Sequence, residues 1–313
     1  MVLKWLIGLV NFLLSFFAIL LNLLIFLPVF RLAFVSRKST IYIIAFFNIM
    51  SDLIQLSIAC FHLSASIMAD RYILSNDRLD FPSVLIGGLS MSAWYMECLV
   101  QIFMAVNRFA VITLNNKTFF TFTSTMTIFI LLLIISFLSA VCVQYLFPCC
   151  RFIIDHNVLS YLQIEVKGVY NYSNALLLFY NVSCTSISFL CYMSVLFSIR
   201  KSNKLAPANV AANRRNQEVK YLIQFVFISF FYVLNWILFE LLLPLIVPAN
   251  QPEWNAIVPI LVSFNCSSNS IIFLAVNPEV QRSLPVSCIR DKLVRGPVSR
   301  TAAVVNPPVN PTN

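Results

Sequence analysis

Long runs of apolar residues follow one another along almost the whole chain. A helix needs about 20 apolar residues to cross the hydrocarbon core of a bilayer. Seven runs meet this requirement, at residues 6–30, 41–67, 83–111, 122–147, 174–198, 219–247 and 255–276. Because lipid offers no partner to backbone amides and carbonyls, each run has to form a helix. The pattern therefore predicts an all-α bundle of seven membrane-spanning helices.

The first run, from Leu6 to Phe30, is too long to be the apolar part of a signal peptide, which measures about 7–15 residues. No small-residue cleavage site follows it. We expect it to be the first span, inserted as a signal anchor.

The positions of the basic residues predict how the spans are oriented. Of the 21 Lys and Arg residues, sixteen fall on the side of the spans that carries the C-terminus and five on the other side. Short loops rich in Lys and Arg stay in the cytosol. We therefore expect the N-terminus outside and the C-terminus in the cytosol, with residues 1–285 as the transmembrane domain and 286–313 as a largely disordered tail.

The composition agrees with a membrane protein, since 60% of the residues are hydrophobic and only 11% are charged. Soluble domains are about 25% charged. The net charge of +9 would suggest a nucleic-acid partner in a soluble protein, but here the orientation bias explains it. The only two histidines, His62 and His156, lie on different segments, and no catalytic or metal-binding motif occurs. We expect no enzymatic activity, no cofactor and no metal centre.

Several polar side chains lie within the predicted spans, where a charge is costly and often functional. Asp52 is near the middle of the second span, and Glu97 is in the third. Asn265 and Asn269 lie one helical turn apart on the seventh. Two neighbouring carboxylates cannot both stay ionised cheaply without a cation, so the four residues could surround water, a proton or Na⁺. Alternatively, each side chain only bonds a neighbouring helix.

The outer halves of two spans carry aromatic and polar faces. Ser90 and Trp94 share one face of the third span, and Trp236 and Glu240 share one face of the sixth. Such faces often only pack, but a carboxylate facing lipid would cost about 2.5 kcal/mol or more. We interpret these four residues as a candidate ligand site. Within the longest outer loop, 148–172, residues 161–170 alternate like a strand and predict a small hairpin lid.

The polar positions resemble those of the rhodopsin-like G-protein-coupled receptors over about residues 6–285. The matching positions are Asn22, Asp52, Asn107-Arg108-Phe109, Trp236 and Asn269–Phe273. The motifs MAVNRF, FPCCRF and VYNYS and the NP pair at 277–278 are similar to the nematode serpentine chemoreceptors of class x, Srx.

The resemblance implies a chemosensory receptor that responds to an extracellular small molecule or peptide. It further implies that Arg108 couples the chain to a heterotrimeric G protein, and that the receptor resides in the plasma membrane, plausibly that of sensory cilia. The chain departs from the superfamily pattern at Asn107 (normally acidic), Leu238 and Ser270 (both normally Pro) and Ser83 (normally Cys). These departures put the usual hinge motions and the usual outer disulfide in doubt.

The remaining candidates for modification are cysteines and one asparagine. Cys149 and Cys150 lie on the oxidising side, and adjacent cysteines seldom pair with each other, so one of them could bridge to Cys60. Cys288 is cytosolic and either palmitoylated or free. Asn171, in Asn-Tyr-Ser, is a sequon that faces outside.

Two other functions compete with the receptor interpretation. An opsin-like light receptor would need a Lys in the seventh span, and residues 255–276 contain none. A channel or transporter could use Asp52, Glu97 and Glu240, and it would conduct ions instead of binding a nucleotide-dependent partner. The chain shows no inverted repeat of the kind common in transporters.

Overall fold

The computed structural model describes residues 2–114, 120–203, 229–230, 232–238, 245 and 251–284. Among these residues, six helical stretches are long and apolar enough to cross a membrane: Val2–Val35, Thr40–Ala69, Phe81–Ile112, Phe122–Leu146, Tyr172–Ser198 and Pro252–Ala275. Most of the predicted sixth span, 219–247, lies outside the described residues, and its described part at 232–238 is helical. The predicted helical bundle is confirmed.

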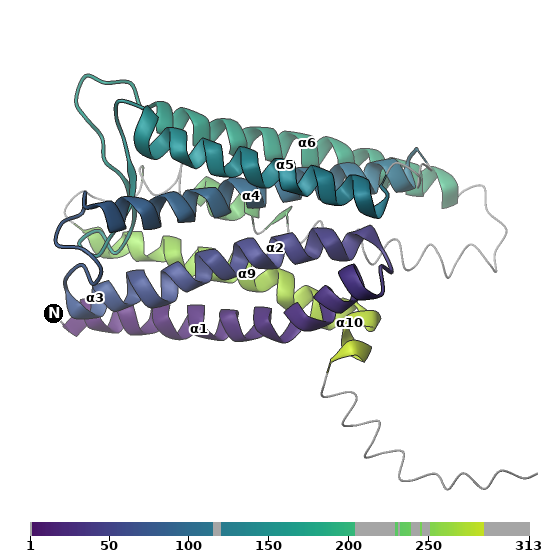
Figure 1. Cartoon of the computed structure of the whole chain (residues 1–313), viewed down its shortest axis with the longest axis horizontal. Coiled ribbons are helices and arrows are strands. Elements are labelled where there is room, and N and C mark those ends of the chain that lie inside the picture. Colours follow the sequence, from purple (N-terminus) through teal and green to yellow (C-terminus); the bar gives the residue numbers. More distant parts are fainter. Residues whose placement is uncertain are drawn as a thin grey trace, which may run out of the picture.

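The stretches consist of the elements labelled in Figure 1. The long helices are α1 (Val2–Phe30), α2 (Thr40–Ser57), α4 (Phe81–Ile112), α5 (Phe122–Val141), α6 (Tyr172–Asn203) and α9 (Ile257–Val276). Short helices are α3 (Ala65–Ala69), η5 (Pro252–Ala256) and α10 (Pro278–Ser283). The π-helical turns η1 (Arg31–Val35), η2 (Ile58–Ser64) and η3 (Cys142–Leu146) continue α1, α2 and α5.

Helix α4 lies at the centre of the bundle. It packs against α5 and α6 on one side and against α2 on the other, while α1, α2 and α9 pack against one another (Figure 1). Side chains of α4 therefore reach both halves of the bundle.

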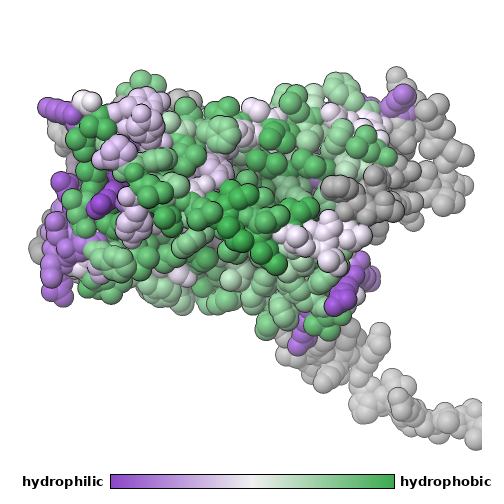
Figure 2. Space-filling view, turned by 45° about the horizontal axis from the view of Figure 1, so that its top comes forward, coloured by the Kyte–Doolittle hydropathy of each residue, from purple (hydrophilic) through white to green (hydrophobic). Residues whose placement is uncertain are grey.

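The flank of the bundle is apolar and its two ends are polar (Figure 2). Large apolar side chains of α5, such as Leu131 and Phe137, are each 53% exposed. Polar side chains point inward instead: Asn22 of α1 is fully buried and donates to the backbone of Cys266 in α9, 3.2 Å away. This inside-out distribution fits a lipid surround.

A two-stranded hairpin covers one end of the bundle, which we call the hairpin end. Strands β1 (Phe152–Asp155) and β2 (Ser160–Gln163) pair antiparallel, as the loop pattern predicts. Gln144 donates to the backbone carbonyl of Phe152 at 2.7 Å. A Cβ added at Gly87 of α4 would overlap that same carbonyl oxygen. The hairpin therefore rests directly on α4.

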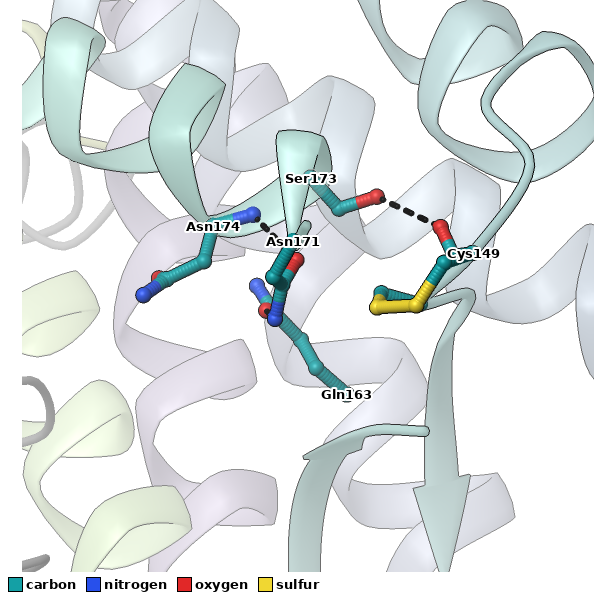
Figure 3. Close-up of a disulfide and its surroundings, with 6 residues drawn as sticks. Cys149, Gln163, Asn171, Ser173 and Asn174 are labelled. Carbon is teal, nitrogen blue, oxygen red and sulfur yellow. Dashed lines mark hydrogen bonds between the residues drawn. A yellow bond between two sulfur atoms is a disulfide. The ribbon is translucent and has the colours of Figure 1, made fainter. Parts of the chain in front are cut away.

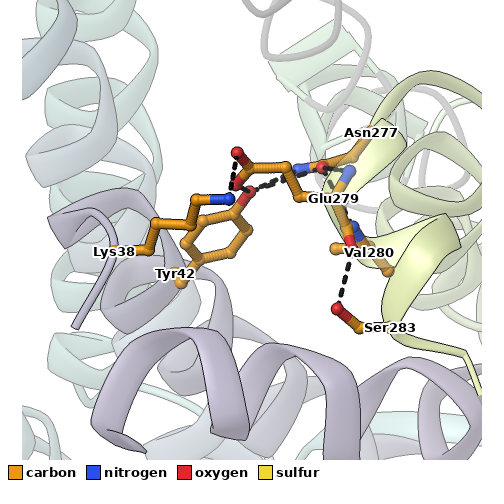
Figure 4. A network of polar contacts seen from close by, with 6 residues as sticks. All are labelled: Lys38, Tyr42, Asn277, Glu279, Val280 and Ser283. Carbon is orange, nitrogen blue, oxygen red and sulfur yellow. Dashed lines mark hydrogen bonds and ion pairs between the residues drawn. The ribbon is translucent and has the colours of Figure 1, made fainter. Parts of the chain in front are cut away.

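The opposite end, which we call the α10 end, is joined by a polar network (Figure 4). The side chain of Asn277 caps α10 by accepting from the backbone of Glu279 and Val280. Lys38 and Tyr42 bind the Glu279 carboxylate at 2.7 and 2.6 Å. Burial raises the pKa of Glu279, but the bonds from Lys38 and Tyr42 outweigh it and hold that pKa below its usual value. The network ties the start of α2 to the end of α9.

The disulfide differs from the expected bridge to Cys60. The structure bonds Cys149 to Cys150, and Ser173 at the start of α6 donates to the Cys149 carbonyl at 3.4 Å (Figure 3). Cys60 is fully buried and free, and its thiol points at the Phe12 carbonyl of α1, 3.8 Å away. Because that thiol faces the inside of the bundle, it cannot meet the loop that lies against α6.

Candidate functional site

A pocket lies beneath the hairpin, between α2, α4, α6 and α9. Its cavity volume is ≈ 40 Å³. The described residues that line it are Gln55, Ser90, Met91, Trp94, Phe152, Tyr161, Leu177, Asn181, Asn235, Val258 and Val262. Phe152 and Tyr161 belong to the hairpin and stack on each other, with ring centroids 5.8 Å apart. The hairpin thus forms the roof of the pocket.

Two of the four residues that the sequence analysis assigns to a ligand site line this pocket, namely Ser90 and Trp94. Trp236 is buried beside it and donates through its indole nitrogen to Thr185 of α6 at 3.0 Å. Glu240 lies outside the described residues.

Sequence reasoning missed the amides that the pocket gathers, Gln55, Asn181 and Asn235. The signal was available, because an amide inside an apolar run is costly unless it finds a partner. What the sequence does not show is which helix supplies that partner.

Asn181 of α6 is the centre of a polar contact set between three helices. Its side-chain oxygen accepts from the Trp94 indole at 3.1 Å and from the Tyr232 hydroxyl at 2.6 Å. The Tyr232 hydroxyl also contacts the Cys98 thiol at 2.9 Å. Trp94 is on α4, Asn181 is on α6 and Tyr232 is on the helical segment 232–238. These hydrogen bonds therefore connect three helices at the floor of the pocket.

The buried acids lie one layer further from the hairpin. Asn48 and Asn269 both donate to Asp52, at 3.1 and 2.9 Å. Gln55 and Asn265 both donate to Glu97, at 2.9 and 2.5 Å. Both carboxylates are fully buried and lie within electrostatic reach of each other. The structure therefore brings together the four residues of the predicted polar cluster.

The same cluster contains side-chain oxygens that have no hydrogen-bond donor among the described residues. One oxygen of Asp52 is in this state, and so are the amide oxygens of Asn48, Asn265 and Asn269. Several buried acceptors without donors are costly. Oxygen atoms are also the ligands that hard cations prefer.

Gln55 connects the pocket to the acid cluster. Its side chain lines the pocket, and its amide nitrogen donates to Glu97. A molecule that displaces Gln55 would therefore change the surroundings of Glu97.

Arg108 lies near the α10 end of α4. Only 6% of its surface is exposed, so its side chain does not reach out to solvent as an interfacial Arg does. Its charge lies within electrostatic reach of Tyr192 on α6.

A polar group at the tip of the hairpin holds the roof to the bundle. His156 is buried and packs edge-on against Tyr72, with ring centroids 4.5 Å apart. It lies 3.8 Å from Asp155. Burial lowers the pKa of His156, against the opposing effect of the Asp155 and Asp70 charges. Asp70 is itself bound by Lys4 of α1 at 2.9 Å.

Of the two residues that are candidates for modification, Asn171 and Cys288, the structure describes only Asn171. Asn171 caps α6 by accepting from the Asn174 backbone at 2.8 Å, and its amide nitrogen donates to Gln163 at 3.0 Å (Figure 3). A glycan on Asn171 would take that nitrogen away from Gln163. Cys288 lies outside the described residues.

Comparisons with known proteins agree with the fold. The family model described as "Serpentine type 7TM GPCR chemoreceptor Srx" matches residues 12–277. No sequence among the curated proteins matches the chain. The crystal structure of squid rhodopsin superposes with a TM-score of 0.73 at 12% sequence identity, covering 92% of this chain and 85% of that one. At this identity the likeness concerns the fold.

Proposed function

Since the chain belongs to the Srx family of serpentine chemoreceptors, a G-protein-coupled class of multi-pass membrane proteins, we propose that its chemical cue binds in the pocket beneath the hairpin. One observation carries this proposal: Gln55 both lines the pocket and bonds Glu97 in the core. A bound molecule thereby gains a direct influence on the packing of α2, α4 and α9. Binding that favours one arrangement of these helices shifts a two-state equilibrium.

The hairpin end faces outside in this proposal, and the α10 end faces the cytosol. The sixteen-to-five distribution of Lys and Arg supports this orientation. The receptor then resides in the plasma membrane, with the ciliary membrane of sensory neurons as the specific site that the family resemblance favours.

The heterotrimeric G protein binds at the α10 end, and Arg108 contributes to the contact. In support, Arg108 stands at the end of α4, the central helix that also carries Ser90 and Trp94 of the pocket. It is buried in this structure, so the coupling has to include its exposure.

The acid cluster binds either one Na⁺ or one proton and thereby stabilises one of the two states. The unpaired oxygens of Asp52, Asn265 and Asn269 support this role, because a cation would satisfy acceptors that the described residues leave without donors. The competing function as a channel or transporter is not favoured, since the family and the fold are both those of receptors.

Two neighbouring leucines of α6 offer a matched test of the pocket. Leu177 lines the pocket and is 3% exposed, whereas Leu178 faces outward and is 42% exposed. Cells that express the receptor and a G-protein reporter would be screened with a panel of small molecules. Every active molecule should lose its effect on Leu177→Trp, which fills the pocket, and keep it on Leu178→Trp. Responses that survive Leu177→Trp at equal surface expression would mean that the cue binds elsewhere.

A further inference from the structure

The polar side chains of the pocket differ in whether their hydrogen-bonding atoms are already used. Four polar side chains other than tyrosine interrupt its apolar walls, those of Gln55, Ser90, Asn181 and Asn235. The hydrogen-bonding atoms without a partner determine which groups a ligand needs, because a buried donor without an acceptor lowers stability.

Asn181 presents a donor to the pocket. The Trp94 indole can only donate, so the side-chain oxygen of Asn181 has to face it. That oxygen also receives the Tyr232 hydroxyl and a longer contact from the Cys98 thiol at 3.8 Å, so both of its lone pairs are used. The amide nitrogen of Asn181 is left with two N–H groups and, among the described residues, no acceptor.

Asn235 carries a second amide nitrogen without a partner in the described part of the chain. Its side chain is 3% exposed, lines the pocket, and has an amide nitrogen that finds no partner among the described residues. Two residues with unbonded amide nitrogens, from different helices, thus line the same pocket.

The described part of the walls offers a ligand no charged group. The described lining residues include no Lys, Arg, His, Asp or Glu, and the nearby Glu97 already accepts from Gln55 and Asn265. A charged ligand would give up its hydration without meeting an opposite charge on these walls. An uncharged ligand with an apolar body gives up far less hydration when it enters the pocket.

We propose that the receptor selects small, uncharged, largely apolar molecules that carry a carbonyl oxygen, such as ketones and esters. The carbonyl oxygen has two lone pairs and no hydrogen of its own, so it accepts from both Asn181 and Asn235. The rest of the molecule packs against Met91, Leu177 and Val262. This assignment rests on the proposed function for the location of the ligand and adds its chemical class.

The test compares molecules that differ only in their polar group. Receptor in lipid nanodiscs would be melted in the presence of 2-alkanones of increasing length, each next to the alkane, 2-alkanol, carboxylate and primary amine of the same length. At the best-fitting length the ketone should bind about tenfold more tightly than the alkane or the alcohol. Absence of stabilisation by every ketone, or a preference for the alcohol or for either ion, would overturn the assignment.

Asn235→Leu separates a ligand contact from a structural role. The substitution removes an amide donor that has no partner among the described residues, so the unliganded receptor should melt at the same or a higher temperature. The preference for ketone over alkane should fall from about tenfold to about threefold, because only Asn181 still donates to the carbonyl oxygen. A variant that keeps the full preference, or that loses stability without ligand, would contradict the role assigned to Asn235.

G-protein nucleotide exchange, measured on the same nanodiscs, keeps the two proposals apart. Ketones that stabilise the receptor without promoting exchange would support the ligand class and contradict the proposed function. Charged molecules that promote exchange would support the proposed function and overturn the ligand class.

Discussion

At Gly87 the backbone of the hairpin roof lies directly against the bundle. Its missing side chain leaves room for the Phe152 carbonyl, which Gln144 holds in place. The neighbouring Gly88 has no such contact, because a Cβ there would meet only the flexible Gln144 side chain at 3.4 Å. Two adjacent glycines therefore carry different constraints.

Gly87→Ala should displace the hairpin, since a backbone carbonyl cannot move aside as a side chain can. Overpacking of this kind costs about 1–3 kcal/mol. We expect a lower melting temperature in detergent and a weaker response to any cue that binds beneath the hairpin. Gly88→Ala is the matched control and should resemble the wild type. Equal behaviour of the two variants would mean that the hairpin does not rest on Gly87.

Glu97 decides between the two forms of the acid cluster. A cation that prefers the resting state must oppose agonist by linkage, typically by about 1–3 kcal/mol. Raising Na⁺ at constant ionic strength should then lower agonist affinity, and Glu97→Gln should remove part of that dependence. If a proton takes the place of Na⁺, the affinity should follow pH and ignore Na⁺. Flat titrations with both ions would mean that Asp52 and Glu97 are only structural bonds.

At the scale of elements, the hairpin is in contact with several segments that lie far apart in the sequence. His156 is held at its tip among charged and aromatic groups from several segments: Asp155 of the hairpin, Asp70 and Tyr72 after α3, and Lys4 of α1. Because His156 is buried, its folded-state pKa is lower than its ordinary value of 6.5. The unfolded or detached hairpin therefore binds the proton more readily than the packed one.

The packed hairpin should consequently lose stability as the outside medium becomes acidic. His156 contributes its full stabilisation above pH 6.5, and the contribution falls as the pH drops towards the lowered pKa. Hydrogen exchange of residues 152–163 should speed up, after correction for the intrinsic pH effect, between about pH 7.5 and 5.5. His156→Gln should flatten this dependence. An identical acid response in the variant would mean that His156 is not the group responsible for it.

The sequence predicts the helices well and their contacts less well, for a physical reason. Lipid forces every apolar run to be helical, so α1, α4 and α9 follow from composition and length alone. That Asp52 and Asn269 lie in contact also follows, because polar groups in such runs need partners. The rotation of each helix about its axis is not visible, which is why Asn181 and Asn235 escape notice. The direction of the Cys60 thiol is likewise not visible, so the sequence alone does not exclude a bridge to Cys60 in favour of the bond between Cys149 and Cys150.

At the scale of the whole molecule, Arg108 connects the bundle to its cytosolic partner in our proposal. Arg108→Ala should abolish cue-evoked nucleotide exchange and leave ligand binding and surface expression near wild type. Lys38→Ala, at the same end but exposed and bound to Glu279, provides a control for general loss of charge. Undiminished exchange in Arg108→Ala would mean that Arg108 only packs within the bundle and does not take part in coupling.

The orientation can be tested with two tags. The exposed turn at Lys167 and Gly168, beyond the hairpin, accepts an insertion without disturbing a strand, and the C-terminus accepts the other. Protease added to intact cells should remove the first tag and spare the second. The reverse pattern, or a glycan mapped to the sequon at Asn116, would mean that the bundle has the opposite orientation in the membrane.

The partners of the buried acids impose an order on how the receptor is made. Asp52 receives its bond from Asn269, 217 residues later, and Glu97 from Asn265, 168 residues later. At about 5–20 residues per second, the ribosome needs roughly 10 to 40 seconds to deliver the donor for Asp52. Until then, the second and third spans stay in the membrane of the translocation site with incompletely satisfied carboxylates. The last span to be synthesised is thus the one that completes the core. A chain that stops before this span exposes incompletely bonded carboxylates within the membrane, by which the cell can distinguish an unfinished receptor.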